Sequence, residues 1–161
     1  MSNHELVNIL IGAAVVALLV VRQMRTRRVK EDSAARITAI LGVIGIIELV
    51  DAGKGHHVGA ATIAWIVLTL VVGAALGAVR AVTVRIWRTA EGPALRKGTA
   101  LTAVLWVVSL GLHLGMESLI DHSSGIAGFG SAGLLLYLAV TLGVQREIVR
   151  WRASRVTVTP A

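Results

Sequence analysis

Long apolar runs separated by short charged stretches constrain the fold of this chain most strongly. The runs are about 14 to 22 residues long and consist mainly of Leu, Val, Ile and Ala. A bilayer selects such runs, because backbone polar groups in hydrocarbon must be hydrogen-bonded within a helix. A transmembrane barrel would instead alternate apolar and polar residues. The hydrophobic content of 55% and the mean hydropathy of +0.77 are also too high for a soluble globule of 161 residues. The sequence therefore predicts an all-α integral membrane protein.

Five spans are predicted in a single transmembrane helical domain that covers residues 1–161. Their cores are residues 6–21, 37–50, 58–79, 99–119 and 126–144.

Two of these helices are expected to extend beyond their apolar cores. The second core has 14 residues and rises only ~21 Å against a ~30 Å hydrocarbon layer, so its helix is expected to extend to Ala34 or Ala52. The third helix is expected to continue to Trp87, because Arg80 and Arg85 can extend their side chains to the interface and Trp87 suits that depth.

The distribution of Lys and Arg predicts the orientation. Segment 22–36 contains six of these residues, segment 80–97 contains five and the tail from residue 145 contains four, whereas the alternate connections contain only Lys54. Basic residues concentrate in cytoplasmic connections. An outside N-terminus and a cytoplasmic C-terminus follow. A model with four or six spans would place one of the basic blocks outside.

This topology gathers the histidines and most acidic residues on the outer side. His113, Glu117 and Asp121 are four residues apart and form one stripe on a helix, and Glu48 and Asp51 form a similar stripe on the second span. Ionisable groups at membrane depth usually face a bundle interior or water. We therefore expect a polar pocket, open to the outer side, that joins Glu48 or Asp51 to His113 and Glu117.

Several chemistries are compatible with these residues. A divalent metal, zinc above all, could bind His56, His57, His113 and Glu117, with Glu48 or Asp51 as further carboxylate ligands. A proton path could couple Glu48 or Glu117 to His113. Haem is not expected, since it needs axial histidines on separate helices and only His113 lies clearly within a span. Alternatively, the His113–Glu117 pair satisfies itself within the bundle and the remaining groups are ordinary surface residues.

Other function classes find little support in the sequence. It has no cysteine, so thiol chemistry and thiolate metal sites are excluded. No catalytic motif is present, and no catalytic residue is assigned. The net charge of +7 does not indicate nucleic-acid binding, because the basic residues adjoin apolar runs and lack interleaved aromatic residues.

Small residues at four-residue spacing suggest where two helices approach each other. Gly73 with Gly77 in the third span, and Gly111 with Gly115 in the fourth, are predicted to form a close contact between these helices.

One segment resembles a known family. From Gly77 to Leu114, a span ends in an Arg-x-x-Thr-Val segment, an acidic-Gly turn follows, and another span begins soon after. This pattern resembles small bacterial membrane proteins related to CcdC, and the matching positions are Arg80, Thr83, Val84, Glu91, Gly92, Arg96 and Gly98. The resemblance covers about a quarter of the chain. It implies a bacterial plasma membrane and an association with cytochrome c maturation, in which a chain without cysteine cannot be the thiol carrier.

These observations favour a non-enzymatic accessory or assembly protein of the bacterial plasma membrane. Its expected partners are the lipid bilayer and other membrane proteins or a second copy of the chain. The alternative is a small transporter, or an ion- or metal-binding membrane protein, that uses the outer His and acidic cluster. Glu48, His113 and Glu117 facing inward together would favour the alternative, whereas separated or solvent-facing side chains would favour the accessory role.

Overall fold

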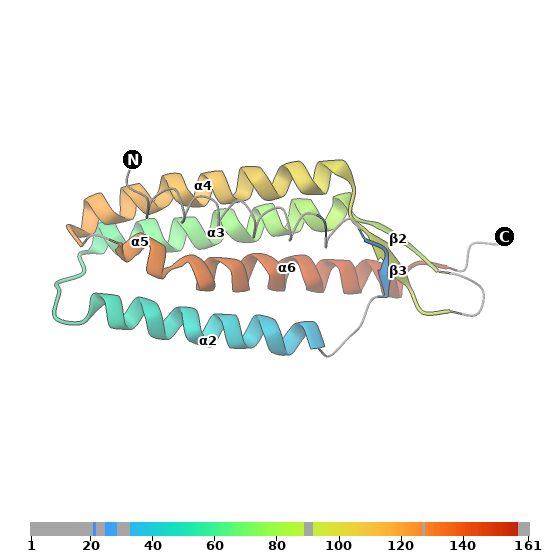
Figure 1. Ribbon diagram of the computed structural model, residues 1–161, viewed down its shortest axis with the longest axis horizontal. Helices are drawn as coiled ribbons and strands as arrows, with labels where there is room; N and C mark the ends of the chain where they lie inside the picture. The colour runs from blue at the N-terminus through green and yellow to red at the C-terminus, as the bar shows by residue number, and fades with distance from the viewer. Residues whose placement is uncertain (1–20, 22–24, 29–32, 89–91, 127, 158–161) are drawn as a thin grey trace.

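Four long helices run side by side along the length of the molecule (Figure 1). The computed structural model describes residues 21, 25–28, 33–88, 92–126 and 128–157. The long helices are α2 (Ser33–Gly53), α3 (Ala60–Thr83), α4 (Ala100–Ser124) and α6 (Leu134–Ser154), and the short helix α5 (Phe129–Ala132) precedes α6. Helix α6 packs against α2 and α3, α4 packs against α3, and α5 contacts α4 and α2. The prediction of a mainly helical fold is confirmed, while residues 6–20 of the first predicted span lie outside the described residues.

Within the described ranges, three helical segments are long and apolar enough to cross a membrane. They are α3, α4 and the segment Phe129–Ser154 that combines α5 with α6. The 24 residues of α3 rise ~36 Å, which exceeds the ~30 Å hydrocarbon layer. Helix α2 has 21 residues, so the expected extension of the second helix beyond its short core is confirmed.

Polarity is inverted relative to a water-soluble protein. The polar and charged side chains buried in the described bundle are Thr62, Thr69, Arg80, Thr102, Ser109, His113, Thr141 and Gln145. Large aliphatic side chains cover the outside, among them Ile47, Val71, Val107 and Leu114. In water this arrangement would expose apolar surface and bury groups that water solvates well. In lipid it is favourable, because apolar side chains meet acyl chains and polar groups bond across helices.

A small antiparallel sheet caps one end of the bundle. Among the described residues it has three strands in the order β1 (Arg27–Arg28), β3 (Leu95–Lys97), β2 (Arg85–Trp87). Ile86 is opposite Arg96, and Arg28 is opposite Leu95 on the other edge of β3. The prediction that the third helix continues to Trp87 is therefore wrong.

The sequence around the end of α3 explains this early termination. Val82, Thr83 and Val84 are β-branched and favour extended backbone. The carbonyls of Ala81, Val82 and Val84 accept hydrogen bonds from Arg152 of α6, with N···O distances of 2.5, 3.2 and 3.1 Å. The last carbonyls of α3 are thus satisfied without another helical turn.

The close helix contact predicted from glycines joins α3 to α6 and not to α4. A Cβ at Gly73 would lie 2.5 Å from Cε2 of Tyr137, and one at Gly77 would lie 2.5 Å from the backbone oxygen of Thr141. At Gly111 and Gly115 an added Cβ would meet no described atom within 4 Å. The predicted pairing of the two glycine pairs is wrong, because α4 turns its glycines outward and contacts α3 through another face.

The last span is shifted along the sequence relative to the prediction of 126–144. Helix α4 ends at Ser124 and is capped by Gly125, whose φ of 66° is left-handed, and α6 starts at Leu134 and ends at Ser154. Gln145, Val149 and Ala153 explain the longer helix, because they are four residues apart and all buried. Val149 packs with Ala81 and Val84 at the end of α3.

Candidate functional site

The residues proposed for the outer pocket lie in two separate places. Glu48 and Asp51 are exposed on α2, and the Asp51 carboxylate forms an ion pair with Lys54. His113 is buried in α4 with 2% of its surface exposed, and Glu117 is half-buried one turn further along. Because the Glu48 and Asp51 side chains are exposed whereas His113 is buried, the structure leaves Glu48 and Asp51 outside the interface that holds His113.

His113 contacts an aromatic and hydroxyl cluster between α4 and α6. Its ring stacks on Tyr137 with centroids 4.5 Å apart and an interplanar angle of 24°. The Tyr137 hydroxyl donates to the backbone oxygen of Ser109 at 2.9 Å and lies 2.6 Å from the Ser109 hydroxyl. The two ring nitrogens of His113 have no hydrogen-bond partner in the described part of the chain. Tyr137 and Ser109 therefore hold the two helices together, and His113 packs on Tyr137 through the face of its ring.

Glu117 and Asp121 meet the turn between α4 and α5. The Asp121 carboxylate accepts hydrogen bonds from the backbone N–H groups of Gly128, at 2.9 Å, and Gly130, at 2.6 Å. Gly130 sits directly on Glu117, since a Cβ at Gly130 would lie 2.6 Å from Cγ of Glu117. Asp121 thus continues the stripe predicted from spacing, and its geometry is that of a turn-stabilising carboxylate.

The two neighbouring histidines face away from the bundle. His56 and His57 are exposed in the connection between α2 and α3, and Nδ1 of His56 lies 3.1 Å from the backbone oxygen of Lys54. Among the described residues no group of three or more His, Asp or Glu side chains is placed to hold a metal ion.

A buried arginine was not predicted. Arg80 has 0% exposure, and its guanidinium carbon lies 3.9 Å above the ring centroid of Trp106. The three guanidinium nitrogens of Arg80 have no hydrogen-bond partner among the described residues. Within the described chain, the charge of Arg80 is therefore stabilised by its cation–π contact with Trp106. The expectation that Arg80 reaches the interface is wrong. The signal was present in the sequence, because Arg80 lies on the same helical stripe as Gly73 and Gly77, which contact α6.

These side chains form a polar column between α3, α4 and α6. On α4 the buried residues Thr102, Trp106, Ser109 and His113 follow one another at intervals of three or four. On α6 the residues Tyr137, Thr141 and Gln145 do the same. At the sheet end, Thr102 also contacts the hydroxyls of Thr83, at 2.9 Å, and Thr99, at 3.1 Å.

The space inside the column is small. The cavity that borders His113, between Leu49, Thr69 and Phe129, has a volume of about 10 Å³. A single water needs at least ~10–15 Å³ by the same measure. The interior around His113 is therefore packed, and it has no room for an organic substrate.

Comparisons with known protein families, curated proteins and solved structures found no match to this chain.

Proposed function

We propose that this chain is a multi-pass protein of the bacterial plasma membrane with a non-enzymatic accessory or assembly role. In this proposal it crosses the membrane five times, with the N-terminus outside and the C-terminus in the cytoplasm. The long apolar helices support insertion in a bilayer, and the concentration of basic residues at the sheet end supports the orientation.

The separation of the ionisable groups carries the proposal. A transporter or metal enzyme of the predicted kind would need Glu48 or Asp51 to converge with His113 and Glu117 on a shared, water-accessible space. Instead Glu48 and Asp51 are exposed on α2, and His113 borders a cavity of about 10 Å³. A chain with a packed interior acts through its helix surfaces and its ends.

The partners proposed for these surfaces are lipid, other membrane proteins or a second copy of the chain. Helix α2 presents Ile40, Val43, Ile47 and Val50 outward, each more than half exposed. The resemblance to CcdC-related proteins is compatible with an assembly role and adds the hypothesis of a link to cytochrome c maturation. A chain without cysteine would support such a pathway by contact and not by thiol exchange.

Purified protein tests this proposal directly. We expect elemental analysis to find no stoichiometric zinc and the absorption spectrum to show no haem band. In proteoliposomes we expect zinc and proton fluxes equal to those of empty vesicles. Stoichiometric metal or haem, or a flux that Glu117→Gln abolishes while His4→Ala does not, would overturn the accessory role.

The polar column supports a second candidate, a proton or ion pathway. The α4 stripe continues from Thr102 through Ser109 and His113 to Glu117 and Asp121, and so runs along most of the helix. Chains of such groups carry protons in pumps and transporters. The flux assay distinguishes this candidate from the accessory role. A proton or ion pathway requires transport that depends on His113 and Glu117, whereas a polar column that only bonds helices together requires no transport.

A further inference from the structure

A groove at the sheet end of the molecule is lined by two arginines and one glutamate. It has a volume of about 550 Å³ and lies between the end of the β2–β3 hairpin and the last turns of α6. Arg88 and Pro93 line it from the hairpin side, and Glu147, Arg150 and Trp151 line it from α6. Small-molecule sites usually occupy ~300–1,000 Å³, so the groove has the size of a ligand site and not of a packing defect.

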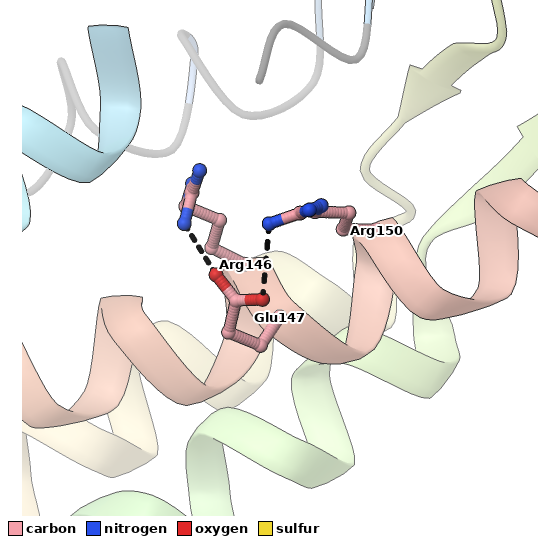
Figure 2. Close-up of polar contacts among 3 residues, drawn as sticks. All are labelled: Arg146, Glu147 and Arg150. Atoms are coloured by element: carbon pink, nitrogen blue, oxygen red, sulfur yellow. Dashed lines mark hydrogen bonds and ion pairs between the residues drawn. The ribbon is translucent and has the colours of Figure 1, made fainter. Parts of the chain in front are cut away.

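An acidic residue at the groove positions two arginines. The carboxylate of Glu147 contacts Arg146 through one oxygen, and its other oxygen lies 3.6 Å from NH1 of Arg150 (Figure 2). Figure 2 shows the two guanidinium groups converging on this carboxylate from the same helix. Glu147 thus helps to hold both guanidinium groups in place on this face of α6.

Arg88 adds a second positive charge from the opposite wall of the groove. Its Nε is buried and has no hydrogen-bond partner among the described residues. Arg155 adds to the local charge, with its guanidinium carbon 3.8 Å from the ring centroid of Trp151. Guanidinium groups bind phosphate oxygens well, because their N–H donors form a planar fork.

The groove lies at the level along the bundle that we expect for the lipid headgroup layer. Helix α3 ends at Thr83 after rising ~36 Å, so its end marks the edge of the hydrocarbon layer, and the groove follows just beyond. Trp151 is 54% exposed at this level. Tryptophan is enriched where acyl chains meet headgroups. The acyl chains of a lipid bound here would run along the apolar outside of the bundle.

From these observations we infer that the groove lined by Arg88, Arg150 and Trp151 binds the phosphate headgroup of an anionic phospholipid. The inference rests on insertion in a membrane and not on the accessory role. A failure of lipid binding would leave the metal and flux tests of the proposed function unaffected.

Full-length protein in a neutral detergent provides the test, with short-chain phosphatidylglycerol as the probe and phosphatidylcholine as the neutral comparison. Bound lipid is counted by native mass spectrometry, and apparent affinity is read from the rise in unfolding temperature. We expect phosphatidylglycerol to bind in preference to phosphatidylcholine. The double variant Arg88→Gln with Arg150→Gln should weaken its binding by on the order of tenfold or more, since each arginine contributes ~1 kcal/mol towards an anionic headgroup.

A matched control removes the same charge from the same end of the molecule. Arg85→Gln with Lys97→Gln changes two exposed strand residues that do not line the groove. This variant should keep its affinity to within about twofold, as expected for screened surface charges. The single variant Arg88→Gln separates binding from folding, because Arg88 makes no ion pair with a described residue and its loss should leave the circular dichroism spectrum unchanged.

Three outcomes would overturn the inference. Equal losses of phosphatidylglycerol affinity in the groove and control variants would show that binding depends on general surface charge and not on the groove. Equal binding of phosphatidylcholine would remove the preference for an anionic lipid. Stabilisation by inorganic phosphate at the same concentration would make the groove a site for free phosphate and not for lipid.

Discussion

At the residue scale, the side chains between the helices combine packing with hydrogen bonding. Lipid gives no hydrophobic drive for two apolar helices to associate, so close packing and polar contacts across helices must supply it. Tyr137 does both, because its ring covers Gly73 and stacks on His113 while its hydroxyl bonds to Ser109. This one side chain joins three helices.

Removing only the hydroxyl of Tyr137 tests that role. Tyr137→Phe keeps the ring contacts and loses both hydrogen bonds to Ser109, so we expect the free energy of unfolding to fall by about 0.5–2 kcal/mol. Unfolding in a denaturing detergent measures the change. Ser109→Ala completes a double-mutant cycle, and strictly additive effects of the two substitutions would show that the hydroxyls are not coupled.

Arg80 presents the opposite case, a charge buried without a hydrogen-bonded partner among the described residues. Its contact with Trp106 contributes up to ~2 kcal/mol in a desolvated site, against a larger cost of burying the charge. We expect Arg80→Met, which fills a similar volume, to leave the unfolding temperature unchanged or to raise it. Arg80→Ala should lower it, because the cavity costs ~2–5 kcal/mol. If both variants were equally unstable, the charge itself would be stabilising.

At the scale of elements, α3 and α6 share the most extensive contact in the described bundle. Gly73 and Gly77 allow the α3 backbone to approach Tyr137 and Thr141 so closely that a methyl group would not fit. At Gly111 and Gly115, which have the equivalent spacing on α4, an added Cβ would meet no described atom within 4 Å. A small-residue motif shows that close approach is allowed, but it does not identify the partner helix.

Two alanine substitutions distinguish these faces. Gly77→Ala places a methyl group 2.5 Å from a backbone oxygen of α6, which can move only if the helix moves, so we expect a loss of more than about 1 kcal/mol. Gly115→Ala places a methyl group where no described atom lies within 4 Å and removes a glycine from a helix, which should leave stability unchanged or raise it by up to about 1 kcal/mol. Thermal unfolding in detergent measures both changes. Equal destabilisation would indicate a partner on the outer face of α4.

The sequence predicted where the helices lie along the chain better than it predicted which elements pack against one another. The apolar runs located α2, α3 and α4 to within a few residues, because hydropathy follows from composition along one segment. The strand Arg85–Trp87 was missed, since it depends on pairing with Leu95–Lys97 and on Arg152 from the far end of the chain. For the site, spacing placed His113, Glu117 and Asp121 on one stripe. The spacing could not show that Glu48 faces away from His113 and Glu117, because its orientation depends on which helices pack together.

At the scale of the whole molecule, the two ends of the bundle differ in charge and in structure. The start of α2 and the end of α6 lie at the sheet end, together with Arg85, Arg96 and Lys97 (Figure 1). The connections at the other end are short and contain Lys54 as their basic residue. Because α2, α3, α4 and α6 run alternately in opposite directions along the bundle, the start of α2 and the end of α6 lie at the same end.

Labelling of single cysteines tests the proposed orientation, and the natural absence of cysteine makes each variant unambiguous. His122 and Arg155 are both exposed, at the end of α4 and just after α6. We expect a membrane-impermeant maleimide to label His122→Cys in intact cells and to label Arg155→Cys only after permeabilisation. The reason is the placement of fifteen of the sixteen basic residues in the segments assigned to the cytoplasm. Labelling of both variants in detergent confirms that each thiol can react, and labelling of Arg155→Cys in intact cells would reverse the orientation.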